Sequence, residues 1–179
     1  MAKKPSKSET LSIRMDPKTR FMLEFVARLR GQTITTVIER SISAAADSAT
    51  VGEYQNERSW RDFWSVSDGE RALKMAGEAD LHPTWEEERR LAFTKRFWPF
   101  FYTSSKCEYF KNPYLEVLWP QIDEIIEHHE TNVPTNANAG PDYMAQLLST
   151  AKLKAPKWPP EQKKDFIIGI GGPDDEIPF

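Results

Sequence analysis

Residues 10–15 alternate between polar and apolar side chains without interruption. In a strand, successive side chains point to opposite faces, so one face carries Leu11, Ile13 and Met15 and the other carries Thr10, Ser12 and Arg14. A lone strand of this length exposes its edges and its apolar face, so it is unstable by itself. The simplest partner is the same segment of a second chain. The alternation therefore predicts a two-stranded ribbon in a homodimer.

Two amphipathic helix patterns follow this strand. Asp16 is a favourable N-cap, and Pro17 suits the first helical position, where no N–H is needed. Gly31 stands where a helix end favours a left-handed residue, and Thr33 can cap the second helix. We expect the two helices to cover the apolar face of the ribbon. The predicted dimer core is Leu11, Ile13, Met15, Phe25, Leu29, Val37, Ile38 and Ile42.

In the order and spacing of these elements, residues 10–46 resemble the ribbon-helix-helix fold of the Arc and MetJ repressors and of many bacterial antitoxins. The resemblance rests on the strand, the Gly31 turn between two short helices, and the Val37–Ile42 segment. It implies that alternate polar residues of the ribbon read bases in the major groove of double-stranded DNA, which admits such a ribbon. It also implies that the start of the second helix anchors a phosphate. The implied base-contacting residues are Thr10, Ser12 and Arg14, and the implied phosphate anchors are Thr33, Ile34 and Thr35.

Charge is distributed unevenly along the chain. The net charge is −3, but residues 1–48 contain nine Lys or Arg and five Asp or Glu, a net of +4, which leaves −7 for the remainder. A basic N-terminal part on an acidic body fits phosphate binding at one end. Residues 1–9 form an expected flexible arm whose lysines add sequence-independent affinity for phosphates. Those lysines are Lys3, Lys4 and Lys7.

The sequence after residue 48 of this 179-residue protein predicts a second part, which is helical. After the head at 10–48, residues 49–59 are polar and are predicted to form a linker. Residues 60–150 are rich in aromatic residues and contain two capping boxes, from Ser67 to Glu70 and from Thr84 to Glu87, which indicate helix starts. Residues 151–179 are predicted to be a proline-rich linker and a flexible tail. The predicted fold class is therefore mainly α, a ribbon-helix-helix head followed by a small all-α domain.

No pattern in the sequence indicates catalysis, a metal or a cofactor. His128 and His129 are adjacent, lack the i, i+4 spacing of a zinc pair, and are expected to face solvent at a helix end. The single cysteine, Cys107, has no histidine near it in the sequence, so an inert thiol is expected. There is no apolar run near the ~18 residues that span a membrane and no signal-peptide pattern. With one cysteine, a reducing cytoplasm is the expected location.

These features favour a sequence-specific DNA-binding protein, a transcriptional repressor that acts as a homodimer or as stacked dimers on DNA. Two alternatives share the same head. One is an antitoxin whose C-terminal part binds a toxin, and the other is an accessory protein of plasmid maintenance or DNA transfer. An enzyme is the least favoured class. In each alternative we expect a protein partner for residues 60–179, and we expect no interaction with a membrane.

Overall fold

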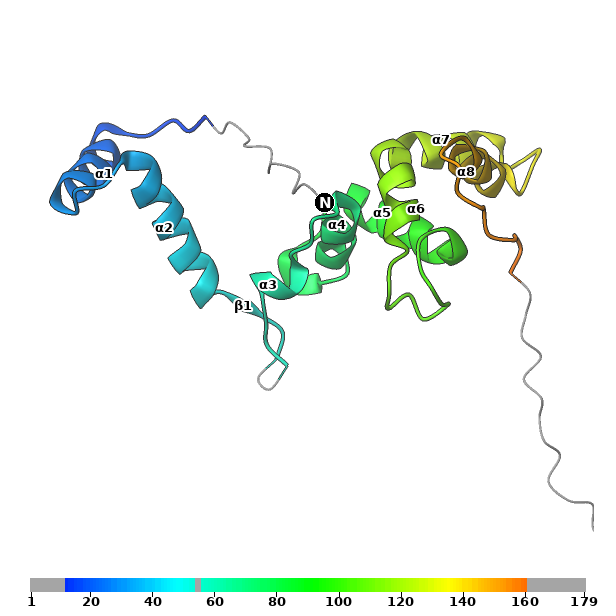
Figure 1. Cartoon of the computed structure of the whole chain (residues 1–179), viewed down its shortest axis with the longest axis horizontal. Coiled ribbons are helices and arrows are strands. Elements are labelled where there is room, and N and C mark those ends of the chain that lie inside the picture. Colours follow the sequence, from blue (N-terminus) through cyan, green and yellow to red (C-terminus); the bar gives the residue numbers. More distant parts are fainter. Residues whose placement is uncertain (1–11, 54–55, 161–179) are drawn as a thin grey trace, which may run out of the picture. The chain divides into compact units, whose positions relative to one another are not determined.

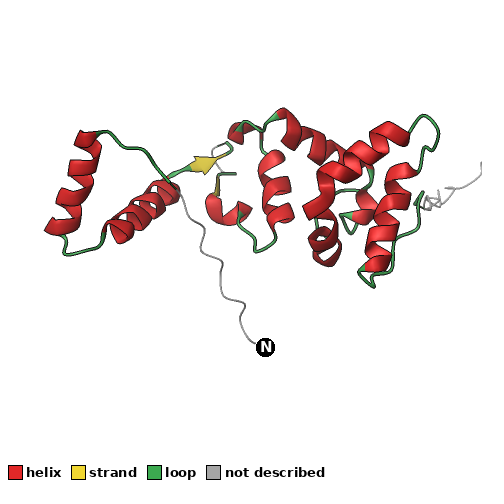
Figure 2. Ribbon diagram, turned by 90° about the horizontal axis from the view of Figure 1, so that it is seen from above, coloured by secondary structure: helices red, strands yellow, loops and turns green. Residues whose placement is uncertain are grey.

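The computed structural model describes residues 12–53 and 56–160 and is mainly helical (Figures 1 and 2). No helix in these ranges combines the length and the apolar character that crossing a membrane requires. The elements in chain order are α1 (Pro17–Leu29), α2 (Ile34–Ser48), β1 (Thr50–Val51), β2 (Arg58–Ser59), α3 (Trp60–Phe63), α4 (Asp68–Ala76), η1 (Ala79–Leu81), α5 (Trp85–Arg96), η2 (Trp98–Phe100), α6 (Asn112–Leu118), η3 (Trp119–Gln121), α7 (Ile122–Asn132) and α8 (Ala139–Thr150), where η denotes a 3-10 helix.

The chain divides into two compact units, the first ending at Asp62 and the second beginning at Phe63. The head unit holds α1, α2 and the β1–β2 hairpin, and the body unit holds α4 to α8. The boundary falls within α3, close to the position 59/60 at which the sequence predicted the start of a helical domain. Each unit is described below by itself.

Capping groups define the two helices of the head, as the sequence predicted. The Asp16 carboxylate accepts hydrogen bonds from the N–H groups of Lys18 and Thr19, at 2.9 and 3.1 Å. At the other end of α1, Gly31 is left-handed with φ of 59°, and the N–H of Gln32 donates to the carbonyl of Ala27 at 2.9 Å. These contacts form a Schellman motif, which needs a residue without a Cβ penalty at the Gly31 position.

The residues predicted as a strand and as a linker differ from expectation in the single chain. Ser12 to Met15 carry no regular secondary structure there, and Thr10 and Leu11 lie outside the described residues. A strand is defined by hydrogen bonds to a neighbouring strand. Within residues 49–59, β1 pairs with β2 in an antiparallel hairpin, with Thr50 opposite Ser59. The predicted linker therefore contains a short hairpin, because backbone pairing does not require an apolar pattern.

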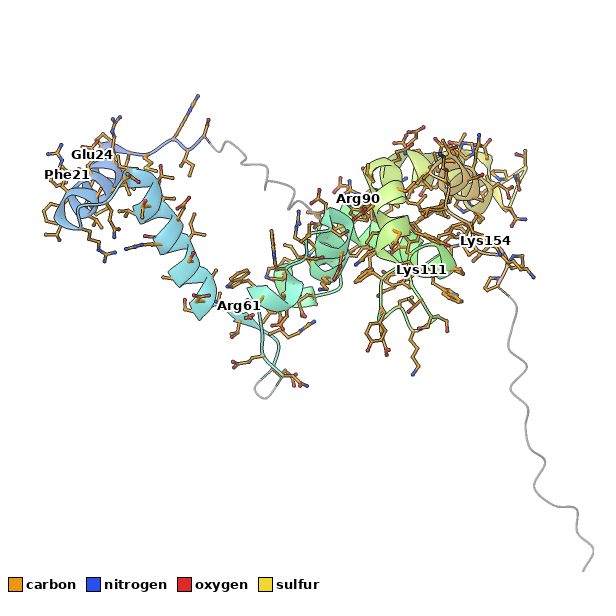
Figure 3. All side chains as sticks on the ribbon, viewed as in Figure 1. Phe21, Glu24, Arg61, Arg90, Lys111 and Lys154 are labelled. Carbon is orange, nitrogen blue, oxygen red and sulfur yellow. The ribbon has the colours of Figure 1, made fainter. Side chains whose placement is uncertain are left out.

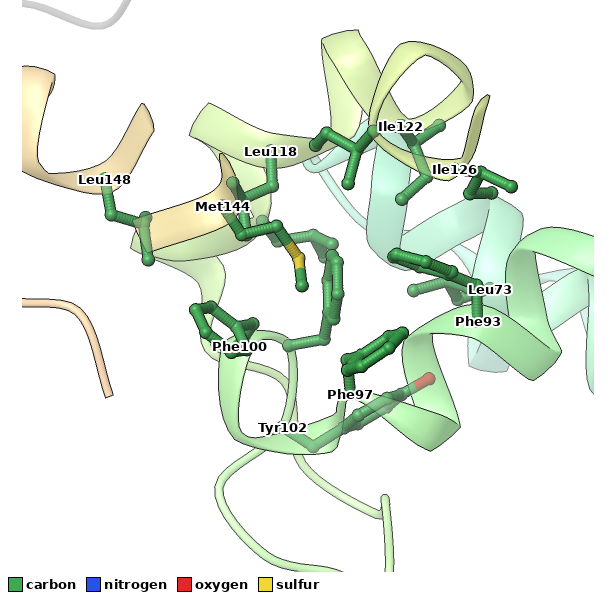
Figure 4. Packing of buried hydrophobic residues seen from close by; sticks show 13 residues of the cluster. Leu73, Phe93, Phe97, Phe100, Tyr102, Leu118, Ile122, Ile126, Met144 and Leu148 are labelled. Atoms are coloured by element: carbon green, nitrogen blue, oxygen red, sulfur yellow. The ribbon is translucent and has the colours of Figure 1, made fainter. Parts of the chain in front are cut away.

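The core of the body is a single aromatic and aliphatic cluster (Figure 4). The α5–η2 segment supplies a run of aromatic side chains, and the other helices surround it with leucine, isoleucine and methionine. A buried Thr94 hydroxyl lies 3.3 Å from the Tyr102 hydroxyl, which satisfies both polar groups in the core. The cluster consists of Leu73, Phe93, Phe97, Phe100, Phe101, Tyr102, Leu115, Leu118, Ile122, Ile125, Ile126, Met144 and Leu148.

Helix boundaries in the body follow caps and prolines. Thr84 and Glu87 form the complete predicted capping box at the start of α5. Pro99 and Pro120 each lie in a 3-10 segment, η2 and η3, because proline cannot continue an α-helical hydrogen-bond ladder. At α4 the predicted box forms only in part, since the Ser67 hydroxyl accepts the N–H of Glu70 but the carboxylate of Glu70 bonds to the Ser65 hydroxyl instead.

The aromatic residues of the body are buried to different degrees. Phenylalanines fill its core, whereas Trp64 and Trp85 are exposed and Trp98, Trp119 and Trp158 are half-buried. One expectation for the body needs correction. Residues 151–160, expected to begin a linker, instead pack against the core cluster. The Trp158 ring lies 5.1 Å from the ring of Phe97, between centroids, so burial of one large ring holds a stretch that has no helical pattern.

Candidate nucleic-acid interface

The segment before α1 presents both of its predicted faces to solvent. Ser12 and Arg14, two of the three expected base-contacting residues, are exposed. The apolar residues between them are exposed as well, Ile13 to 55% and Met15 to 39%. The third expected base contact, Thr10, and the arm residues Lys3, Lys4 and Lys7 lie outside the described residues, as does Leu11 of the expected dimer core.

The head buries few of its apolar side chains. Only Ala27 of α1 and Val37 of α2 are buried, and both lie between the two helices. Of the expected dimer core, Phe25, Leu29 and Ile42 are more than half exposed, and Ile38 is partly buried. Figure 3 shows Phe21 on α1, and its ring stacks on that of Phe25 with 6.3 Å between centroids. The helix pair thus carries a large apolar surface that nothing in its own described chain covers.

The start of α2 has the geometry of an anion site at a helix end. The Thr33 hydroxyl accepts the N–H of Thr36 at 3.1 Å and lies 2.9 Å from the Thr36 hydroxyl. The N–H groups of Ile34 and Thr35 precede the capped one, and a helix provides no acceptor for its first N–H groups. These three expected phosphate anchors are exposed and belong to one turn of chain.

Asp16 caps α1 directly after the segment that was predicted as a strand. The Thr19 hydroxyl and the N–H groups of Thr19 and Lys18 donate to its carboxylate, and they hold the pKa of Asp16 below its usual value. Asp16 is therefore ionised at neutral pH and caps α1 two residues after Arg14.

A polar contact that the sequence did not reveal connects the start of α3 to the end of α2. The Asp47 carboxylate accepts from the indole N–H of Trp60 at 3.0 Å and from the Arg61 guanidinium at 2.7 Å. The Arg61 guanidinium also lies over the Trp60 ring, 4.7 Å from its centroid. The side chains are 13 and 14 residues from Asp47 in sequence, beyond the range of any helical periodicity. Trp60 and Arg61 thus belong to the head.

In the body, the histidine expectation is corrected. His129 is not solvent-facing but buried, 3% exposed, and its Nδ1 accepts the N–H of Gly140 at 3.3 Å. Burial lowers the pKa of His129. Its ring lies edge-on to Phe97, 5.0 Å between centroids, so it packs as a core residue. Among the described residues no group of histidine, cysteine and carboxylate side chains is arranged to hold a metal ion.

The Cys107 thiol is partly buried. Its sulfur lies 3.6 Å from the carbonyl oxygen of Ser105, and burial raises the pKa of the thiol. A raised pKa leaves the thiol protonated and weakly nucleophilic at neutral pH. The expectation of an inert thiol agrees with this geometry.

Comparison of the chain with protein-family models, with curated proteins and with solved structures finds no match.

Proposed function

We propose that the protein is a sequence-specific DNA-binding protein that acts as a homodimer and represses transcription. Residues 10–15 of two chains pair into a ribbon, and the ribbon enters the major groove of double-stranded DNA. Arg14 and its polar neighbours Thr10 and Ser12 contact base edges, while the start of α2 and the N-terminal lysines hold the phosphates.

The observation that carries this proposal is the uncovered apolar surface of the head. Ile13, Phe25 and Ile42 are each exposed to 55% or more in the single chain. Apolar surface of this extent on a small unit marks a protein–protein interface. A second copy of the same unit supplies an identical, self-complementary surface, as a two-fold dimer requires. Pairing would also satisfy the backbone edges of Ser12 to Met15.

The polar side of the same segment suits base recognition. With Ile13 and Met15 turned into the dimer, the alternation turns Ser12 and Arg14 to the opposite face. An arginine can donate two hydrogen bonds to guanine, a contact worth about 1–3 kcal/mol of discrimination. The N–H groups at the start of α2 favour a phosphate oxygen because a helix N-terminus carries partial positive charge.

Selection of duplexes from a random pool tests the proposal. The full chain should enrich a short, two-fold symmetric DNA sequence, because a symmetric dimer reads two equal half-sites. Replacing Arg14 by alanine should lower the preference for the selected duplex over a scrambled one by about tenfold or more. Arg14→Lys keeps the charge but loses the bidentate geometry, so it should retain affinity for scrambled DNA and still lose preference.

The arm provides the matched control. Replacing Lys3, Lys4 and Lys7 by alanine should weaken binding to selected and scrambled duplexes equally and reduce the salt dependence of both. Lys106 lies in an exposed loop of the body, so Lys106→Ala should change neither the affinity for these duplexes nor its salt dependence. If no duplex is enriched, or if Arg14→Ala leaves the preference unchanged, the proposed face of the ribbon is wrong.

A further inference from the structure

The body contains a groove of about 480 Å³ between the start of α4, the α6–η3 segment and the start of α7. Its floor is apolar and consists of Leu115, Trp119 and Ile122. At its lip Val66 is 92% exposed, the highest value among the large hydrophobic residues described. Val66 therefore extends the apolar lining of the groove to its exposed edge.

The groove is built by a close helix contact. Gly69, in the first turn of α4, is buried, and a Cβ on it would lie 2.7 Å from Cγ of Trp119 and 2.8 Å from Cγ of Leu115. Only glycine lets α4 lie this near the floor. Because Leu115 is fully buried, the floor is held by the core cluster and is preformed rather than adaptable.

The rim of the groove is acidic. Asp68, Glu116 and Asp123 line it together with a single cation, Arg90 (labelled in Figure 3). The Arg90 guanidinium donates to both carboxylate oxygens of Asp123, at 2.7 and 2.8 Å. Asp68 forms a salt bridge with Arg71, which is outside the groove. The cation at the rim is therefore already neutralised.

Glu116 remains as the unpaired charge, since it forms no salt bridge with any residue that the structure describes. The hydrogen bonds that Arg90 donates to Asp123 raise the pKa of Arg90, and the carboxylates of Glu86 and Glu87 of α5 raise it further through electrostatic attraction. The field at the groove is thus negative. It repels a nucleic-acid backbone and attracts a cationic side chain.

We propose that this groove binds a short basic segment of a partner protein. A large apolar side chain of that segment packs against the partly exposed ring of Trp119 and against Val66. A neighbouring lysine or arginine pairs with Glu116. Burial of the apolar anchor supplies most of the affinity, and charge complementarity selects the partner. This activity belongs to the body and is independent of DNA binding by the head.

Selection from a library of short random peptides displayed on phage tests the groove with the full chain. Enriched peptides should share one tryptophan, phenylalanine or leucine next to lysine or arginine. A synthetic peptide of the enriched sequence should bind in calorimetry, and Glu116→Lys should weaken its binding at least about tenfold, equivalent to ~1.4 kcal/mol. Val66→Ser should weaken it as well, because the lip contact is removed.

Glu88→Lys is the matched control, since Glu88 is exposed and lines a separate hollow with Pro83 and Leu91. This variant should bind the peptide as the original chain does. Circular dichroism should show the same helix content in all variants, which excludes unfolding as the cause. The proposal is overturned if no peptide is enriched, if the enriched peptides are acidic, or if both charge reversals weaken binding equally.

Discussion

Replacement of Ile13 probes the dimer directly, because the structure sets the size of the effect. Ile13 is 55% exposed in the single chain, so about half of its surface is available for burial by a partner. Full burial of such a side chain contributes about 1.5–3 kcal/mol, and an alanine keeps only part of it. The expected loss is about 1 kcal/mol per chain. A two-fold dimer contains the residue twice, so Ile13→Ala should weaken dimerisation by ~2 kcal/mol, or about thirtyfold in Kd.

Ile13→Asp should have a larger effect, since a carboxylate would also have to leave water without a partner. Sedimentation equilibrium of the full chain over a concentration series measures both dissociation constants. Val66→Asp is the control, because it makes the same change in charge at a more exposed residue of the body. If the Ile13→Asp chain dimerises as tightly as the original one, Ile13 lies outside the interface and the ribbon is refuted.

Two further predictions concern the body. Burial lowers the pKa of His129 below its ordinary value of 6.5, so on acidification the unfolded chain takes up a proton before the folded chain does. The free energy of unfolding is therefore unaffected by His129 above that pH and falls below it, by at most ~1.4 kcal/mol per pH unit. Urea unfolding at several pH values should show this slope. The His82→Gln variant should retain the slope, and the His129→Gln variant should lose it. Equal slopes in the two variants would contradict the prediction. Trp158→Ala removes ring contacts to Phe97 and Phe100 and should lower the free energy of unfolding by about 1–3 kcal/mol, less than for a fully buried ring. An unchanged thermal midpoint would show that residues 151–160 do not support the core.

Local signals in the sequence located most helix ends. Asp16, Gly31 and Thr33 occupy the predicted caps because capping depends on residues within one turn. The capping box from Thr84 to Glu87 formed for the same reason. The mainly helical fold class also follows from patterns of this range.

Contacts between distant segments could not be predicted from such local signals. Asp47 of α2 accepts hydrogen bonds from Trp60 and Arg61 of α3, and no periodicity of the sequence connects these residues. Burial of His129 depends on Gly140, because a Cβ at that position would lie only 3.1 Å from Cγ and Nδ1 of the imidazole ring. The groove beside Val66 likewise requires the close approach of α4 to α6. Each of these features arises from packing between elements and not from the pattern of any one element.

The number of chains in the DNA complex tests directly whether the ribbon forms between two chains. Sedimentation velocity of the full chain with a duplex selected for binding gives the number of chains on each site. We expect two chains per selected duplex and no stable complex with one, because each half of the proposed ribbon comes from a different chain. A stable complex that contains a single chain, or failure of the chain to enrich any duplex, would contradict it.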